Sequence, residues 1–445
     1  MSSKIKSVNG FRIWDSRGRP TVEVEVQLES GAIGLGIAPA GASRGSNEAI
    51  DLRDGGTAHG GFGVDRAVAN VNGPIRQALI GLDAIDQAML DAVLIERDGT
   101  ANKSVLGGNA IVATSMAMLK AAAAAQQQSV WRYLSAAEDV TLPLPQVQIF
   151  GGGAHAGRRT DIQDFLVMPV GAQSFDHAMV ICADIYRAAG QIMLAKGAQC
   201  GVADEGGWWP NFDSNEQALE TLTRSIDQAG YGHGQALIAL DIAASEFGRN
   251  GRYRLALDQH EYDTDAWLEL VSRWVARYPI ISIEDPVAED DQVGMQKITT
   301  ALGHRIQIIG DDFLVTNAQR VTDAQKSGAC NAVLIKPNQA GTITETLATF
   351  RCAKSLDWGT IVSARSGETE DTLIAHLAVG LAAGQLKVGS FARSERMAKW
   401  NECLRIERSG DVAVRPFSAK VLPVPVPVPV LTLSPAASGP SLPAT

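Results

Sequence analysis

Six apolar runs, each closing on a charged residue, recur through the second half of this chain. They are ALIALD, PIISIED, RIQIIGDD, NAVLIKPN, TIVSARS and QLKVG, and the charged residues near their ends are Asp241, Glu284, Asp311, Lys336, Arg365 and Lys387. A single run of this kind is most simply an ordinary core strand. Six in succession, mostly 22 to 29 residues apart after a first interval of 43, are typical of repeated β/α units. The pattern predicts a parallel barrel, whose functional side chains collect at the carboxyl ends of its strands.

The N-terminal part follows a different pattern. The segment TVEVEVQLESG, which starts at Thr21, alternates apolar and polar residues, as in a half-buried antiparallel strand. A helix-prone stretch covers residues 107–126, and the proline-rich LPLPQ at 142–146 is a candidate junction. We therefore expect an α+β domain over residues 1–141, a barrel domain over 142–418 and a proline-rich, disordered tail over 419–445.

Composition narrows the range of partners. The chain has 445 residues, a net charge of -10 and a hydrophobic fraction of 45%. An acidic protein of this kind lacks the clustered lysines and arginines that nucleic acids or membrane surfaces need, so we expect neither as a partner. The five cysteines show no CxxC spacing, and we find no signal peptide and no membrane-spanning run. These features favour a cytoplasmic protein.

The charged strand ends suggest a metal site. Asp241, Glu284 and Asp311 offer oxygen ligands from three successive strands, which suits a hard cation such as Mg²⁺. The alternative is that each acid pairs with a nearby lysine or arginine. Lys336 and Lys387 follow on later strands, and a lysine crowded by a divalent cation and a second lysine is a candidate base. A structural ion pair is the alternative for both lysines, more so for Lys387.

Two loops add groups for acid–base chemistry. The segment DEGG contains Glu205, and HAGRRTDIQDF contains His155 and Asp164. Two carboxyl groups that come close together are driven apart in pKa, which yields a general acid and a supporting partner. DEGG alone would be weak evidence for such a role.

Many segments of the chain resemble the enolase family, in the family's order. They are WDSRGRPTVEVEV, PAGASRG, GNAIVATSMA, DEGGWWPN, LDIAASEF, SIEDP, GDDFLVTN, LIKPNQAGTITETL, SARSGETEDT and GQLKVGS, and they cover about residues 5 to 410. The resemblance implies an N-terminal α+β capping domain on a modified eight-stranded β/α barrel, usually as a homodimer. It also implies two Mg²⁺ ions per site and the dehydration of a small phosphorylated acid of the 2-phosphoglycerate type to an enol ester.

The resemblance assigns roles position by position. The implied metal ligands are Asp241, Glu284, Asp311 and, for the second ion, Ser43. Lys336 resembles the base that removes the C2 proton and Glu205 the acid that assists hydroxide departure, with Asp164 and His155 beside it. Lys387 resembles a lysine next to the substrate carboxylate, while Arg365 and Ser366 resemble the groups that hold the phosphoryl end. We also expect Gln163 among the substrate-binding residues.

The chain departs from the family at several of these positions. Ala364 in SARSGE stands where enolases have a histidine beside the phosphoryl group, and Asp164 replaces a glutamate. Arg44, Arg158 and Arg159 are additional charges in loops where the family carries small or uncharged residues. Further departures are Trp208, Trp209 and Pro337.

These departures favour a substrate with a bulkier or more anionic phosphoryl end, since arginine forks bind carboxylates and phosphates well. One enolase-like branch fits: carboxyphosphonoenolpyruvate synthase, from biosynthesis of phosphinothricin-type antibiotics. In this hypothesis Ala364 makes room for an additional carboxylate, and Arg44, Arg158 or Arg159 neutralises it. The alternatives are a glycolytic enolase, which converts 2-phosphoglycerate to phosphoenolpyruvate, and a non-catalytic protein on an enolase scaffold.

Overall fold

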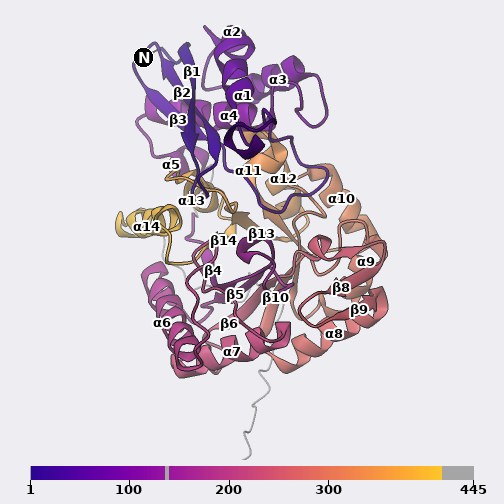
Figure 1. Cartoon of the computed structure of the whole chain (residues 1–445). Helices are drawn as coiled ribbons and strands as arrows, with labels where there is room; N and C mark the ends of the chain where they lie inside the picture. The colour runs from indigo at the N-terminus through magenta and orange to yellow at the C-terminus, as the bar shows by residue number, and fades with distance from the viewer. Residues whose placement is uncertain (1, 136–139, 413–445) are drawn as a thin grey trace, which may run out of the picture.

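The computed structural model describes residues 2–135 and 140–412 (Figure 1). An N-terminal α+β domain stands over one end of a closed barrel. Its antiparallel sheet has the order β1 (Ile5–Trp14), β2 (Pro20–Leu28) and β3 (Ile33–Ile37). The strand predicted from Thr21 is β2, and its side chains Val22, Val24 and Val26 are fully buried, as the alternating pattern indicates.

One helix covers this small sheet. It is α4 (Gly108–Ala125), as predicted for residues 107–126, and it packs on β2 and β3. The backbones approach so closely that a Cβ atom at Gly34 would lie 2.1 Å from the carbonyl oxygen of Ala117, so only glycine fits there. The other helices of the domain are α1 (Asp65–Asn70), α2 (Arg76–Leu79), α3 (Gln87–Asp98) and α5 (Val130–Leu134).

The second domain is an eight-stranded barrel, and all six apolar runs form strands in it. Its strands in order around the barrel are β4 (Leu144–Gly151), β5 (Asp164–Met168), β6 (Leu237–Asp241), β10 (Ile280–Glu284), β11 (Gln307–Gly310), β12 (Ala332–Ile335), β13 (Gly359–Ser363) and β14 (Gly384–Gly389), which pairs with β4. Strands β10 to β12 are buried at every residue, as expected for strands covered on both faces.

The expectation of a wholly parallel barrel is wrong at one strand. Strand β5 pairs antiparallel with both β4 and β6. The segment between β4 and β5 holds only a short 3₁₀ turn at Gly153–Ala156, and no crossover helix returns the chain to the other end of the barrel. The barrel is therefore the modified enolase type that the resemblance implies.

Helices surround the barrel. They are α6 (Phe175–Ala195), α7 (Asn215–Gln228), α8 (Thr264–Arg277), α9 (Gln292–Leu302), α10 (Ala318–Ser327), α11 (Pro337–Ala340), α12 (Ile343–Ser355), α13 (Leu373–Gly380) and α14 (Ser394–Arg408). Helix α6 is long and apolar enough to cross a membrane by length and composition, but 56% of its apolar window is buried and it packs on α7 and β4. It is therefore a core helix of this domain.

The long first interval between charged strand ends holds additional strands. A small antiparallel sheet follows β6, with the strands β7 (Gly248–Arg249), β8 (Arg252–Leu255) and β9 (His260–Asp263), and α8 comes after it. This insertion accounts for the interval of 43 residues that did not fit one β/α unit.

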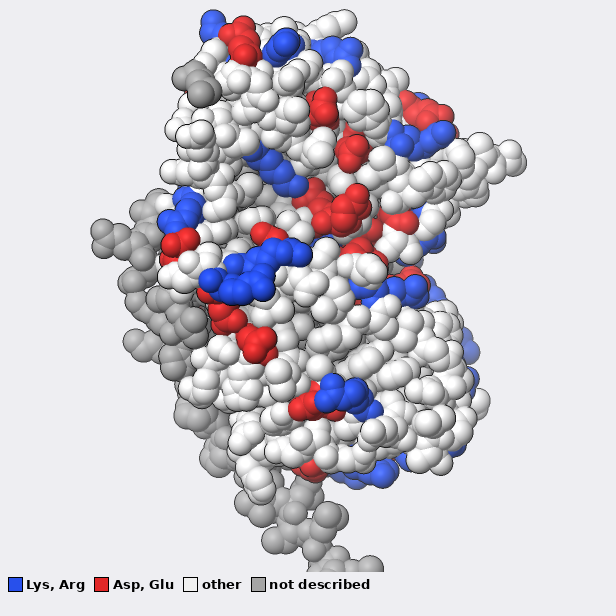
Figure 2. All heavy atoms as spheres, turned by 90° about the vertical axis from the view of Figure 1, so that its left-hand side faces the viewer, with Lys and Arg blue, Asp and Glu red and all other residues white. Residues whose placement is uncertain are grey.

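The N-terminal domain covers the carboxyl ends of the barrel strands. Ala40 forms a β-bridge with Gly367 just after β13, and the amide of Ser16 donates to the carbonyl oxygen of Glu368 at 2.8 Å. On the face in Figure 2, acidic and basic side chains are interspersed over a largely uncharged surface. The proposed tail, residues 419–445, lies outside the described residues, and the domain limits stay predictions.

Candidate active site

The three predicted metal ligands lie at neighbouring strand ends. Asp241 ends β6 and Glu284 ends β10, where the two residues are in register, and Asp311 follows β11 directly. All three side chains are buried. Lys387 on β14 reaches into the same place, with its Nζ 2.7 Å from Asp241 Oδ2 and 2.7 Å from Glu284 Oε2. The barrel thus brings together the acids and one lysine, as the strand-end pattern predicts.

These acids and Lys387 perturb one another. Burial, and after it the charge of Asp241, raises the pKa of Glu284 well above its usual value. Burial alone would lower the pKa of Lys387, but Asp241 and Glu284 outweigh it and raise that pKa. Asp164 also faces this ammonium, with its Oδ2 3.8 Å from Nζ. One ammonium therefore serves three buried carboxylates, and negative charge is in excess.

The residues present fit a bound Mg²⁺ ion. Among the described residues, three buried acceptor oxygens near this cluster have no hydrogen-bond donor: Glu284 Oε1, Asp164 Oδ2 and Gln163 Oε1. Gln163 meanwhile donates its Nε2 to Asp241 Oδ2 at 3.0 Å. Carboxylate and amide oxygens in a site with excess negative charge are what a hard divalent cation prefers. A second group of carboxylates, Asp285, Asp311 and Asp312, has ligand atoms within 4.8 Å of one another.

The candidate base is paired with one of these acids. Lys336, which follows β12, donates from Nζ to Asp311 Oδ2, and Gln339 Nε2 donates to Asp311 Oδ1 at 2.8 Å. Burial would lower the pKa of Lys336, but Asp311 outweighs it and raises the pKa. Without a cation on Asp311, the lysine is therefore held in its protonated form. Lys336 therefore forms the ion pair that the sequence left as an alternative, and it lines the same cavity as the other candidate catalytic groups.

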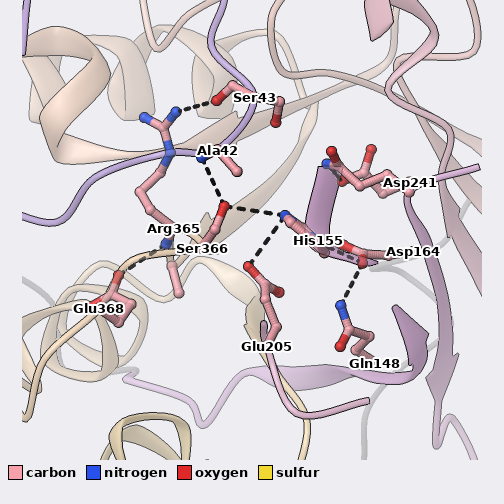
Figure 3. Close-up of polar contacts among 12 residues, drawn as sticks. Ala42, Ser43, Gln148, His155, Asp164, Glu205, Asp241, Arg365, Ser366 and Glu368 are labelled. Atoms are coloured by element: carbon pink, nitrogen blue, oxygen red, sulfur yellow. Dashed lines mark hydrogen bonds and ion pairs between the residues drawn. The ribbon is translucent and has the colours of Figure 1, made fainter. Parts of the chain in front are cut away.

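A buried histidine connects the two acidic loops (Figure 3). His155 Nδ1 lies 3.0 Å from Asp164 Oδ1, and its Nε2 lies 3.8 Å from Glu205 Oε1 and 3.2 Å from Ser366 Oγ. Burial would lower the pKa of His155, but Asp164 and then Glu205 outweigh it and raise the pKa to about 9. The side chain is thus an imidazolium near neutral pH, between the carboxyl groups of Asp164 and Glu205. Gln148 Nε2 donates to the same oxygen of Asp164.

The expected phosphoryl-binding residues lie on the other side of this network. The Oγ of Ser366 accepts from the amide of Ala42 at 2.9 Å, and Arg365 Nη2 donates to the carbonyl oxygen of Ser43 at 3.0 Å (Figure 3). The loop that carries Ser43 is therefore fastened to the strand end after β13. Ala364 is buried between Ser363 and Arg365, and its amide donates to the carbonyl oxygen of Lys387 at 2.9 Å.

A single small cavity joins these groups. Its volume is about 20 Å³ and its lining includes Lys336, Glu205, His155, Ala364 and Ser366. The rest of the lining is Ser43, Gln163, Asp164, Asp241, Ser363, Arg365, Lys387 and Val388. The candidate base, the candidate acid and the expected carboxylate and phosphoryl contacts thus line one cavity.

The three loop arginines do not reach this cavity. Arg44 is exposed, Arg158 Nη2 pairs with Glu246 Oε2 at 2.7 Å, and Arg159 Nη2 donates to Asn211 Oδ1 at 2.7 Å. None of them contributes to its lining. Trp208 stacks on Tyr186, with ring centroids 4.8 Å apart, and so packs the loop of Glu205 against α6.

Sequence reasoning missed two buried partners of this site. Glu48 forms a two-pronged ion pair with Arg365, and Arg396 on α14 donates to the carbonyl oxygens of Arg365, Val388 and Ser366. The side chain of Arg396 is fully buried and its Nη1 lies 3.8 Å from Glu205 Oε1. Glu48 and Arg365 are 317 positions apart, and Arg396 binds backbone carbonyl groups that lie 8 to 31 residues before it, so no spacing of side chains marks these partners.

Comparisons with known proteins agree with this geometry. Residues 139–415 match the family described as "Enolase, C-terminal TIM barrel domain", and residues 5–134 match "Enolase, N-terminal domain". A curated relative, "Enolase 1" of Desulfitobacterium hafniense (strain Y51), is 49% identical over 410 residues, which are 91% of this chain and 94% of the relative.

Proposed function

Because the chain belongs to the enolase family, whose members are Mg²⁺-dependent lyases, we propose that it converts 2-phosphoglycerate to phosphoenolpyruvate and water. The observation that carries this proposal is the shared lining of one cavity by Lys336 and Glu205. A base and an acid that line the same cavity are what the removal of a proton and a hydroxide from adjacent carbons requires. The name of the relative, Enolase 1, supports the same reaction.

In this proposal each end of the substrate has its own partners. Lys387 lies next to the substrate carboxylate, and Arg365 and Ser366 hold the phosphoryl group. Asp241, Glu284 and Asp311 would hold one Mg²⁺ ion, and Ser43 would help to hold the second. Bound Mg²⁺ would supply positive charge that offsets the substrate carboxylate and the charge that develops there when the C2 proton leaves.

The protein groups then move two protons. To act as a base Lys336 must be neutral, and a cation that balanced Asp311 in its place would favour that form. Lys336 then accepts the C2 proton at Nζ, and the electron pair of the C–H bond forms the new double bond between C2 and C3. Glu205 donates a proton to the C3 hydroxyl, which leaves as water. The imidazolium of His155, between Asp164 and Glu205, stabilises the carboxylate that remains on Glu205.

A second candidate substrate depends on Ala364. Ala364 stands where the family has a histidine, so the site has one hydrogen-bond donor fewer next to Arg365 and Ser366. This difference favours a carboxyphosphono compound as the second candidate substrate. One observation favours the ordinary substrate: Arg158 and Arg159 have partners outside this cavity and do not line it. The comparisons do not point to a phosphonate.

The test is turnover of both substrates by the purified protein at saturating Mg²⁺. Ultraviolet absorbance follows the formation of phosphoenolpyruvate, and phosphorus NMR follows the carboxyphosphono analogue. Conversion of 2-phosphoglycerate supports the proposal. Turnover of the analogue alone would replace it with the second candidate, and no turnover of either would favour a non-catalytic scaffold.

We also propose that the protein works in the cytoplasm as a homodimer. Three large apolar side chains are about half exposed on one face of the sheet of the N-terminal domain, the face turned away from α4: Phe11, Ile33 and Leu35. A second copy of the chain that covered them would remove this apolar surface from water. Sedimentation in solution tests the assembly, and a monomer at micromolar concentration would contradict it.

A further inference from the structure

A second cavity, larger than the small cavity of Lys336 and Glu205, lies outside it. Its volume is about 470 Å³, within the range of small-molecule sites. Its lining comes from the turn after β4, the 3₁₀ turn after β6 and strands β7 and β8. The linings of the two cavities share no residue. This larger space therefore needs an explanation of its own.

Four arginines line this cavity, in a protein whose net charge is -10. They are Arg158, Arg249, Arg252 and Arg254. Within the part of the chain that the structure describes, the last three form no ion pair and no side-chain hydrogen bond, and all three are exposed. The two acids of the lining are already engaged, Glu246 by Arg158 and Asp161 by the amides of Ala256 and Leu257. Within the lining, four arginines stand against two acids. On β9, Asp263 and Glu261 lie opposite Arg252 and Arg254 in the β8–β9 pair, but no ion pair joins them to these arginines in the described structure.

The strand geometry concentrates that charge. Arg249 and Arg252 stand directly opposite each other in the β7–β8 pair, and like charges in this position destabilise a sheet. Arg254 lies two residues further along β8, on the same face as Arg252, because Tyr253 and Leu255 point into the core. Three guanidinium groups therefore lie on one face of a short hairpin, an arrangement that an anion would stabilise.

Arg158 also lines the cavity, and its backbone conformation is strained. Its φ of 59° lies in the left-handed region, which residues other than glycine and asparagine seldom adopt. This conformation costs free energy, and a binding role for the guanidinium of Arg158 would account for that cost. Apolar groups of Phe247, Ala154 and Ala256 complete the lining and suit the organic part of a ligand.

We propose that this cavity is a second anion site, which binds a small molecule carrying two or more phosphoryl groups. Arginine forks bind phosphoryl oxygens in pairs, and several forks around one space favour a polyphosphate over a single carboxylate. The site also reaches the catalytic cavity through one turn. Arg158 donates its amide to the carbonyl oxygen of Gly153 at 2.7 Å, and His155, between them, faces Glu205. A ligand on Arg158 thus orders the turn that carries His155.

The experiment measures binding of inorganic tripolyphosphate to the full chain by calorimetry at low ionic strength. The variant Arg252→Gln/Arg254→Gln removes two guanidiniums from the outer face of β8. The control Arg187→Gln/Arg273→Gln removes the same charge from exposed helix positions outside the cavity. We expect the wild type and the control to bind tripolyphosphate with the same affinity. The β8 variant should bind it at least about 10-fold more weakly.

A second readout is amide hydrogen exchange in residues 152–163. Tripolyphosphate should slow exchange there in the wild type and in the control, and leave it unchanged in the β8 variant. Equal binding by the β8 variant, or no binding by the wild type, would overturn the proposal. Equal affinity for hexaglutamate through the same arginines would overturn the preference for phosphoryl groups. Neither measurement needs turnover, so the result is independent of the proposed reaction.

Discussion

Glu48 of the N-terminal domain and Arg365 of the barrel form a buried, two-pronged ion pair, with Nη1 2.9 Å from Oε2 and Nη2 3.1 Å from Oε1. Both side chains are at most 5% exposed. The contact holds the guanidinium next to Ser366 and ties the loop of the first domain to the strand end of the second. The proposed phosphoryl site therefore depends on how the two domains are joined.

The first prediction concerns this pair. Glu48→Gln leaves the buried Arg365 guanidinium without its carboxylate, and we expect a loss of about 3 kcal/mol in the free energy of unfolding. KM for 2-phosphoglycerate should rise as well, because Arg365 loses its fixed orientation. Denaturant unfolding and steady-state kinetics measure the two effects. The control Glu220→Gln removes an exposed acid, and equal losses in both variants would contradict the account.

The second prediction concerns the proposed base. Lys336→Ala should lower kcat by about 10³-fold or more, because no other group accepts the C2 proton. Lys326→Ala, which removes a largely exposed lysine on α10, should have no effect on kcat. Rates are measured at saturating Mg²⁺. Activity of Lys336→Ala within a few-fold of the wild type would exclude this lysine as the base.

The third prediction concerns the pH dependence of stability. The pKa of His155 in the folded protein is about 9, above the ordinary value near 6.5. The stabilisation from its carboxylate partners is therefore fully present below about pH 6.5 and lost as the pH rises through about 9. The total is about 3 kcal/mol.

Denaturant unfolding of the wild type and His155→Gln, with a chelator present, measures this effect. The advantage of the wild type over the variant should shrink between about pH 6.5 and about pH 9. Two stability curves that stay parallel over this range would show that His155 does not change its protonation there.

The fourth prediction concerns the metal. Mg²⁺ at about 100 times its Kd should stabilise the protein by about 3 kcal/mol, because it binds the native state. Glu284→Gln removes one proposed ligand and should abolish most of the rise in Tm, whereas the exposed Asp265→Asn should keep it. A full Mg²⁺ shift in Glu284→Gln would place the ion elsewhere.

The fifth prediction concerns Ala364. Ala364→His should improve kcat/KM for 2-phosphoglycerate by up to about 10-fold, since it adds a donor beside Arg365 and Ser366. The same change should impair any use of the carboxyphosphono analogue, because the imidazole fills the space that its carboxylate needs. If both activities changed in the same direction, the argument from space at this position would fail.

Much of the fold could be predicted from the sequence because its signals are local. A strand that is buried on both faces appears in the sequence as a run of apolar residues. The strands β6 and β10 to β14, and the charged residues at their ends, could therefore be predicted from the sequence. The direction of β5 could not be predicted from the sequence, because β5 runs antiparallel only where no crossover helix follows β4. Periodicity identifies a strand, but it does not specify the direction in which it pairs.

In the site, too, the contacts between strand ends could be predicted, and the contacts between separate segments could not. Asp241, Glu284 and Lys387 were predicted to converge because neighbouring barrel strands end at one edge, and they do. The Glu48–Arg365 pair joins residues 317 positions apart, and Arg396 binds backbone carbonyl groups rather than side chains. Contacts of this kind leave no spacing pattern in one sequence, so they could only be found in the structure.

The most direct test of the central claim separates the two proton transfers. In D₂O, Glu205→Gln should still exchange the C2 proton of 2-phosphoglycerate, because Lys336 is intact, while it forms little phosphoenolpyruvate. Lys336→Ala should show neither exchange nor product. Proton NMR of the substrate at saturating Mg²⁺ measures the exchange. Exchange by Lys336→Ala at the rate of the wild type would contradict the assignment of base and acid to these two residues.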